Sequence, residues 1–285
     1  MSVGIRGTTR LAVVLGWPVA HSRSPQMFEA AFAATGVDAR MLPIAVPPED
    51  FATAIAGLRV MRMLGASVTV PHKLAALAVC DDLTPEAREI GAVNCLALDG
   101  ARLVGHNTDA GGFGDALANA GATPRRAVLL GGGGAARAVA YALVARGATV
   151  EVVARHPDRV AWAPARPWSS EQLAAAFRGA DLVVDTTPIG LADTAAQDAF
   201  VDELPLDAFD PAGWIATLVY HHPTRLLERA AARGHSTVDG RTMLVHQGAR
   251  AFTIWTTLCA PHEVMSRALE SSLVSATGTS AATSA

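Results

Sequence analysis

The sequence has little charge and little cysteine. Charged residues make up 17% of its 285 residues, below the ~25% typical of globular proteins, and the net charge is −3. A basic surface that would attract nucleic acid or anionic lipid is therefore not expected. The three cysteines (Cys80, Cys95 and Cys259) form no CxxC motif and leave an odd count, which argues against a disulfide framework and favours a reducing cytoplasm.

Long hydrophobic runs and metal-binding patterns are also absent. No run approaches the ~18 apolar residues of a membrane helix. The apolar stretch 11–20 superficially resembles a signal peptide, but Pro18 interrupts it, so a buried strand is the better interpretation. The nine histidines contain no HExxH motif, and the adjacent pair at 221–222 has the wrong spacing for a metal. We expect neither membrane nor metal binding, which leaves a small polar metabolite as the favoured partner.

Strand and helix patterns alternate along the chain, which predicts an α/β fold with a mostly parallel sheet and an antiparallel edge. The edge comes from a hairpin signal, Asp99-Gly100. Ser24 is predicted as a helix N-cap and Pro25 as the first helical residue. Strands are expected at 11–16, 41–46, 67–70, 93–98, 102–105, 126–130, 149–154, 181–185 and 214–219, and helices at 24–36, 49–63, 74–80, 135–146, 242–258 and 262–269.

The length indicates two domains, since one domain usually has roughly 100–200 residues. The strand–helix pattern restarts in the second half, so we place the division near Asp109. Residues 273–285 are small and polar, and we expect a disordered tail there.

A glycine-rich turn carries the first functional signal. Gly131, Gly133 and Ala136 satisfy G-x-G-x-x-G/A between a predicted strand and a predicted helix, which is the arrangement of a dinucleotide site. The motif alone is weak, because a flexible turn gives the same letters. The next strand ends in Ala154-Arg155-His156 without the acid that NAD-binding proteins use. Arg155, assisted by Arg159, can pair with a 2′-phosphate, which favours NADP(H) as the cofactor. The alternative interpretation is that Arg155 is a solvated surface residue.

Lys73 is the only lysine, against 22 arginines. A lysine amine can donate and accept a proton at physiological pH, whereas arginine cannot, so a lone lysine after a strand end is a candidate acid/base. A chance surface lysine is the alternative. Asparagine occurs only three times, and two of these residues, Asn94 and Asn107, lie close to Asp109 in the sequence. Asp109 is either a functional acid or a helix N-cap or first-turn acid.

Seven short motifs follow one another between residues 16 and about 255. They are GWPVAHSRSP (16–25), VTVPHK (68–73), AVN (92–94), NTD (107–109), GGGGAARAV (131–139), YHHPT (220–224) and MLVHQGARAF (243–252). In this order and spacing they resemble the motifs of the shikimate dehydrogenase family. The resemblance implies an α/β substrate domain (1–109, completed by 242–272) and a Rossmann-type NADP domain (110–241) across a cleft. It also implies reversible, NADPH-dependent reduction of 3-dehydroshikimate to shikimate in aromatic amino acid biosynthesis, by a monomer or homodimer.

The resemblance also implies a role for each matching residue. Ser22, Ser24 and Tyr220 would hold the substrate carboxylate, and Thr69, Asn94 and Gln247 the ring hydroxyls, although Gln247 could instead be a satisfied core amide. Lys73 would donate the proton, and Asp109 would pair with its amine and orient it. The implied cofactor-binding residues are Gly131, Gly132, Gly133, Gly134, Ala135, Ala154, Arg155, Arg159 and Thr187.

The chain departs from the family pattern at several positions. The family's Asn before Val-Thr is Ser67, its Asn-Ala-Thr-Pro is Asp185-Thr186-Thr187-Pro188, and its aspartate three residues before the tyrosine is Thr217. Because Ser67 is close to the ring-binding positions, quinate or an amino-substituted shikimate remains an alternative substrate. A non-catalytic NADP-binding regulatory module is a further alternative, which the joint presence of Lys73 and Asp109 disfavours.

Overall fold

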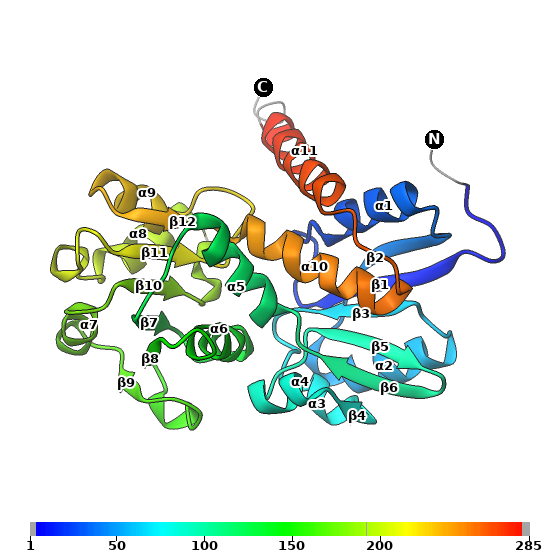
Figure 1. Cartoon of the computed structure of the whole chain (residues 1–285), viewed down its shortest axis with the longest axis horizontal. Helices are drawn as coiled ribbons and strands as arrows, with labels where there is room; N and C mark the ends of the chain where they lie inside the picture. The colour runs from blue at the N-terminus through cyan, green and yellow to red at the C-terminus, as the bar shows by residue number, and fades with distance from the viewer. Residues whose placement is uncertain (1–3, 192, 281–285) are drawn as a thin grey trace. The chain divides into compact units, whose positions relative to one another are not determined.

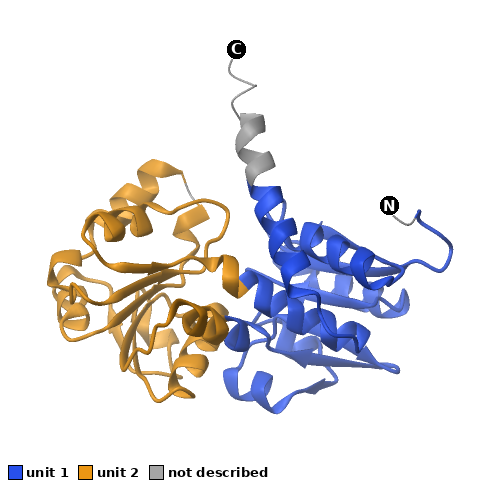
Figure 2. Ribbon diagram, turned by 45° about the horizontal axis from the view of Figure 1, so that its top comes forward, with its two compact units in different colours: residues 1–112, 244–285 blue, residues 113–243 orange. Residues whose placement is uncertain are grey.

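The computed structural model describes residues 4–191 and 193–280, and the chain divides into two compact units (Figure 2). Unit 1 comprises residues 1–112 and 244–285, and unit 2 comprises residues 113–243. The sequence placed these divisions after residues 109 and 241. No helix in the described part of the chain has the length and apolar character needed to cross a membrane.

Unit 1 is built on a six-stranded sheet of order β2-β1-β3-β5-β6-β4 (Figure 1). The strands are β1 (Arg10–Gly16), β2 (Ala39–Ala45), β3 (Gly65–Val68), β4 (Asp82–Leu83), β5 (Cys95–Asp99) and β6 (Arg102–His106). Only β5 runs against its neighbours, β3 and β6. The predicted hairpin is confirmed, but its place at the sheet edge is wrong, because two-residue β4 pairs in parallel with the outer side of β6.

Two helical layers cover this sheet. One face packs on α2 (Phe51–Val60), α3 (Ala76–Val79) and α4 (Pro85–Ile90) in a continuous apolar core. On the other face lie α1 (Ser24–Thr35), α10 (Gly240–Thr256) and α11 (His262–Ser280). Phe28 of α1 packs on Trp255 of α10, with ring centroids 5.0 Å apart. Trp255 in turn covers Gly65, whose lack of a side chain lets the indole ring approach the strand.

Unit 2 contains a fully parallel sheet of order β12-β11-β10-β7-β8-β9. The strands are β7 (Arg126–Leu130), β8 (Thr149–Ala154), β9 (Ala165–Pro167), β10 (Leu182–Asp185), β11 (Trp214–Thr217) and β12 (Ser236–Val238). Counted along the chain from β7, this is the strand order 3-2-1-4-5-6 of the Rossmann fold. The order reverses between β7 and β10, and ligands of such sheets bind at the carboxyl ends of the strands at that switch point.

The helices of unit 2 are α5 (Asp109–Ala120, which begins in unit 1), α6 (Gly134–Val144), α7 (Ser170–Phe177), α8 (Thr194–Asp202) and α9 (Arg225–Ala232). Side chains of α7, α8 and α9 bury one face of the sheet in an apolar core that includes Leu130, Val183 and Ile215. Helix α6 packs against β7 and β8 (Figure 1). Helices therefore pack on both faces of the strands, and the loops at the carboxyl ends of the strands start from fixed positions.

Several predicted elements have different bounds. Ser24 is the first residue of α1 and does not cap it; Arg23 precedes the helix and makes no side-chain cap bond. The predicted helix 49–63 begins as a 3-10 helix, Pro48–Asp50, and ends as α2 at Val60. The predicted helix 74–80 shortens to α3, because a turn at Lys73 and Leu74 delays its start.

The sequence predicted a disordered tail over residues 273–285, whereas α11 extends through Ser280. Each residue added to a formed helix gains a hydrogen bond without a new nucleation cost, so a small polar sequence can prolong a helix that is already anchored. Residues 281–285 lie outside the described part of the chain.

The close packing of Trp255 on β3 can be tested by Gly65→Ala. A methyl group at Gly65 would lie 2.2 Å from the indole ring, so Trp255 must move and lose the bond from its Nε1 to the Leu96 carbonyl, 3.0 Å. Overpacking of this kind costs about 1–3 kcal/mol, measurable by urea unfolding. Gly57→Ala is the matched control, because nothing lies within 4 Å of its added methyl on α2, and stability should rise by about 0.5–1 kcal/mol. Equal stability of the two variants would contradict this account.

Candidate active site

The central feature of unit 1 is an ion pair between Lys73 and Asp109. The Lys73 ammonium donates to Asp109 Oδ2 at 2.7 Å, and the side chains are only 14% and 6% exposed. Lys73 lies in the turn after β3, and its carbonyl accepts from the Val93 amide at 2.9 Å. The structure thus brings together the two residues that the sequence singled out as a chemical pair, from positions 36 residues apart.

Asn107 leaves the carboxylate of Asp109 available for this pair. Its Oδ1 accepts from the amides of Asp109 and Ala110 at 3.1 and 3.2 Å, which caps the first turn of α5. Its Nδ2 donates to the Ala92 carbonyl at 2.9 Å. Asp109 is the first residue of α5, yet Asn107 supplies the cap. The first-turn position proposed for Asp109 is therefore correct, and it does not compete with the bond to Lys73.

A second support comes from His72, which the sequence analysis did not select. Its Nε2 lies 2.8 Å from the Val46 carbonyl, and its ring stacks on Phe51 with centroids 4.5 Å apart. The side chain is buried, with 1% exposure. His72 therefore fixes the turn from which Lys73 projects. In the sequence, only its position between Pro71 and the lone lysine could have indicated this role.

Three buried polar residues form a network near the ion pair. Asn94 Nδ2 donates to Thr108 Oγ1 at 2.9 Å and to Gln247 Oε1 at 3.4 Å, and Asn94 Oδ1 accepts from the Thr108 amide at 2.6 Å. Gln247 Nε2 donates to the Leu244 carbonyl at 2.9 Å. Gln247 is therefore a satisfied amide in this structure, while it also lies among polar groups. Thr108 joins Asn94 to Gln247, and the sequence analysis missed it because it stands between two more conspicuous residues.

The remaining predicted groups of unit 1 lie at the carboxyl ends of β1 and β3. Ser22 and Ser24 are buried on the segment that leads into α1, and Ser22 Oγ accepts from the Ser24 amide at 3.3 Å. Thr69 directly follows β3, and its methyl group occupies the space that a side chain at Gly16 would need. Ser67 is 8% exposed and lies on the same face of β3 as Gly65, toward α10. Hydroxyl and amide groups thus collect on this side of the sheet.

The glycine turn of unit 2 has the geometry that a dinucleotide requires. Gly131 has φ +98°, which favours glycine, and its amide donates to the Val153 carbonyl at 2.9 Å. Any Cβ at Gly132 would collide with Val160 at 2.5 Å, whereas Gly133 opens onto free space and precedes α6. Gly134 and Ala135 form the first turn of α6, whose free amides and dipole attract an anion. This turn fits a pyrophosphate.

Two arginines follow β8, the strand after the glycine turn. Ala154 ends β8, and Arg155 and Arg159 are exposed beyond it. Within residues 4–191 and 193–280, neither guanidinium forms an ion pair with an acid. Arg137, on α6, lies over the Trp162 ring at 5.8 Å, and burial lowers its pKa. The unpaired arginines fit the 2′-phosphate of NADP(H), since Ala154, Arg155 and His156 at the end of the strand include no acid to bind a ribose hydroxyl instead.

Thr187 lies at the switch point and bonds to the buried Asp185. Asp185 Oδ1 accepts from the Thr187 amide at 2.9 Å and from its hydroxyl at 2.7 Å. Burial raises the pKa of Asp185 to about 6, and the two bonds from Thr187 oppose that rise. Because this pKa lies above the ordinary value of 3.8, ionisation of Asp185 costs folding stability. That cost grows between about pH 4 and pH 6 and is complete above pH 6.

Tyr220, also in unit 2, contacts the His221 ring in a tilted arrangement, with ring centroids 3.9 Å apart. It belongs to a different unit from Ser22 and Ser24, and its joint role with them stays a prediction.

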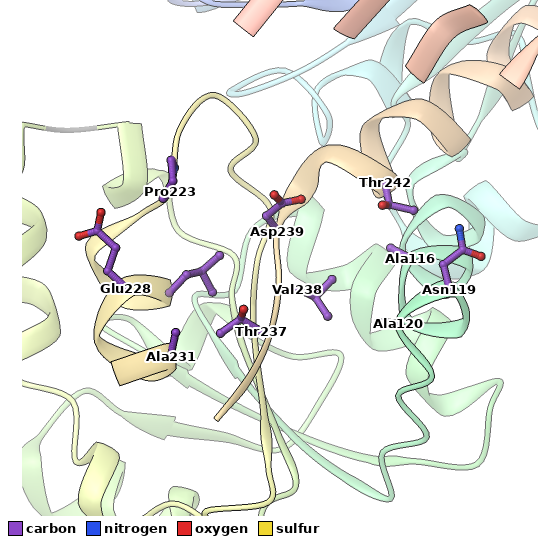
Figure 3. A pocket seen from close by; sticks show the side chains of 11 residues that line it. Ala116, Asn119, Ala120, Pro223, Glu228, Ala231, Thr237, Val238, Asp239 and Thr242 are labelled. Atoms are coloured by element: carbon purple, nitrogen blue, oxygen red, sulfur yellow. The ribbon is translucent and has the colours of Figure 1, made fainter. Parts of the chain in front are cut away.

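A pocket of about 560 Å³ lies elsewhere in unit 2, between α5, α9 and β12 (Figure 3). Its lining includes the acids Glu228 and Asp239 and no basic side chain. Such a lining does not suit an anionic substrate or cofactor, and none of the predicted site residues contributes to it.

Comparisons with known proteins agree with this arrangement. Residues 14–96 match the model of the shikimate dehydrogenase substrate binding domain, and residues 240–270 that of the shikimate 5'-dehydrogenase C-terminal domain. A shikimate dehydrogenase (NADP(+)) of Moorella thermoacetica is 40% identical and covers 98% of this chain and 99% of its own length.

Two solved structures are similar over nearly the whole chain. Shikimate 5-dehydrogenase of Thermus thermophilus, in complex with NADP(H) and shikimate, has a TM-score of 0.81 and 38% identity, covering 92% of this chain and 99% of its own. Quinate dehydrogenase of Corynebacterium glutamicum, in complex with NAD, has a TM-score of 0.79 and 28% identity, with coverages of 92% and 99%. With family models at both ends and a 40% identical relative along its whole length, the chain belongs to the shikimate dehydrogenase family.

Proposed function

We propose that this protein catalyses the reversible, NADPH-dependent reduction of 3-dehydroshikimate to shikimate, a step of aromatic amino acid biosynthesis. The single observation that carries the proposal is the partly buried Lys73–Asp109 pair, with 2.7 Å between Nζ and Oδ2, beside a set of hydroxyl and amide groups. The relatives named as shikimate dehydrogenases support the same substrate and cofactor. A non-catalytic binding module has no need of a paired, nearly buried amine.

Lys73 is the proton donor in this proposal. As the ketone carbon is reduced, its oxygen gains negative charge and takes a proton from the Lys73 ammonium. In the reverse direction the neutral amine accepts the alcohol proton. Asp109 holds the amine in one position through a charge-assisted hydrogen bond, so the amine needs no reorientation during the reaction.

The polar groups of unit 1 bind and orient the substrate. Ser22 and Ser24 donate to its carboxylate, and the proposal adds Tyr220 of unit 2 as a further donor. Thr69, Asn94 and Gln247 bind the ring hydroxyls, with Thr108 holding the two amides in position. The amides bond to each other in the structure, and a substrate hydroxyl can replace the long 3.4 Å bond between Asn94 and Gln247 with a shorter one.

Unit 2 supplies the cofactor site. When bound, the reduced nicotinamide provides the hydride. Gly131 opens the turn, and Gly132, Gly133, Gly134 and Ala135 would receive the pyrophosphate with their backbone amides, while Arg155 and Arg159 would pair with the 2′-phosphate. Ala154 and Thr187 shape the two sides of this site. We further propose a cytoplasmic location and a monomer or homodimer, in keeping with three cysteines that form no disulfide.

Substrate choice is tested by a panel assay. Purified protein should oxidise shikimate with NADP⁺ at a kcat/KM at least tenfold above that for quinate or aminoshikimate, read as nicotinamide absorbance. NAD⁺ should support a lower rate, because it lacks the phosphate that Arg155 binds. Faster turnover of quinate would replace the proposed substrate and leave the chemistry of the pair intact.

Lys73→Ala should lower kcat by ~10²–10⁴ and leave KM within a few-fold, as expected from loss of a general acid. Lys73→Arg is the matched control: it keeps a positive charge beside Asp109 but cannot give up its proton. Both variants should therefore be slow, in steady-state assays of shikimate oxidation. Full turnover by either one would remove Lys73 from proton transfer.

Arg155→Ala should raise the KM for NADPH about tenfold to hundredfold, the effect of losing one charge-assisted hydrogen bond, and barely change that for NADH. Arg178→Ala provides the control, because Arg178 is an exposed arginine of the same unit at the opposite end of the sheet. It should leave both constants unchanged. Equal effects of Arg155→Ala on the two cofactors would exclude Arg155 from the phosphate site.

A further inference from the structure

Asp185 is a buried acid that the mechanism above does not use. It is the last residue of β10, pairs in register with Leu130 of β7, and is 2% exposed. Leu130 is followed by the glycine turn, so Asp185 lies where the sheet order reverses and a dinucleotide binds. A carboxylate costs free energy at a buried position, and its retention there calls for a physical reason.

The segment after Asp185 forms a wall of the glycine turn. Thr186 Oγ1 donates to the Leu130 carbonyl at 2.8 Å, with a longer 3.3 Å contact to that of Gly131. A Cβ on Gly131 would lie 3.1 Å from Thr186 Oγ1 and 3.2 Å from Thr187 Cγ2. The two threonines therefore define the space beside the turn, and a shift of a few tenths of an ångström would change it.

Asp185 determines where Thr187 lies. The Thr187 hydroxyl donates to Asp185 Oδ1 at 2.7 Å and accepts from the Ile189 amide at 3.3 Å, so its only hydrogen is already committed. Thr187 thus offers the cofactor its methyl group and backbone, in an orientation that two bonds to one carboxyl oxygen fix. This makes the predicted role of Thr187 dependent on a residue that the sequence did not select.

The neighbouring strand supports the same conclusion. Thr217 of β11 stands opposite Asp185 in the parallel register, on the same face of the sheet. Because Thr217 carries no charge, Asp185 is the one carboxyl group of this register pair, and it stands directly before the loop that borders the glycine turn.

We propose that Asp185 is a positioning residue for NADP(H), which holds the 186–189 loop against the glycine turn and thereby sets cofactor affinity. The inference rests on the proposed function, because it assumes that the switch point binds NADP(H). Asp185 acts through Thr187 and touches neither the substrate nor the reacting atoms.

The test measures NADP⁺ binding directly, by isothermal titration calorimetry on the full chain, alongside kcat for shikimate oxidation. Asp185→Ala should raise the Kd for NADP⁺ at least tenfold, because it leaves the Thr187 amide and hydroxyl without an acceptor. At saturating cofactor its kcat should stay within about threefold of wild type. Asp185→Asn keeps the acceptor oxygen and should bind NADP⁺ within about threefold of wild type.

Asp181→Ala is the matched control, at the residue directly before the same strand. Asp181 accepts from the amides of Arg125 and Arg126 at 2.8 and 3.0 Å, but it precedes β10 and lies at the end of the sheet away from the glycine turn. This variant should lower the melting temperature and leave the Kd for NADP⁺ within twofold of wild type. A purely structural role for Asp185 would make the two alanine variants behave alike.

Unchanged binding by Asp185→Ala, or an equal loss in Asp181→Ala, would overturn the inference while the proposed function stands. Wild-type protein that does not bind NADP⁺ would instead overturn the proposed function, and this inference with it. If Asp185→Ala does not fold, Thr187→Val replaces it, since valine keeps the methyl group and the backbone bond to Asp185 and removes the two hydroxyl bonds, to Asp185 and from the Ile189 amide. That variant should raise the Kd several-fold, and a wild-type Kd would refute the positioning role.

Discussion

The ion pair between Lys73 and Asp109 is the interaction on which the arrangement of unit 1 depends. Removing two charges from water is costly, and a well-packed apolar pair at such a site is often at least as stable. The pair is nevertheless well supported, because Asn107, His72 and the Lys73 carbonyl each make a bond that fixes one end of it. An ion pair of this kind adds little net stability, yet several hydrogen bonds hold its two partners in place. This indicates selection for a function that needs a positioned amine.

Both units place their chemistry by the same means. Parallel strands that are packed on both faces have little conformational freedom. The residues just beyond their carboxyl ends are therefore also held in fixed positions. In unit 1 this applies to Thr69 and Lys73 after β3, and in unit 2 to the glycine turn after β7 and Thr187 after β10. In unit 1 His72 bonds to the Val46 carbonyl and in unit 2 Thr186 bonds to the Leu130 carbonyl, so a side chain holds each turn in place.

The sequence predicted the parts of the structure that local chemistry determines. Strand β8 has the predicted bounds, the Asp99-Gly100 hairpin is present, and the glycine turn connects a strand to a helix. It did not reveal β4, β9 and β12, because strands of two or three residues have no measurable period. The Lys73–Asp109 pair could be found since both residues are conspicuous. Thr108 and Asp185 could not, because their importance comes from burial and register, which only the folded chain determines.

The isolation of Lys73 has a chemical consequence beyond the reaction itself. With a single ε-amine in the chain, reagents that acylate or reductively alkylate lysine have one internal target, 14% exposed and bound to a carboxylate. Surface attachment or cross-linking through side-chain amines therefore cannot proceed without modifying Lys73, the proposed proton donor. Labelling of that amine should be slow, and its rate would measure how often the ion pair opens.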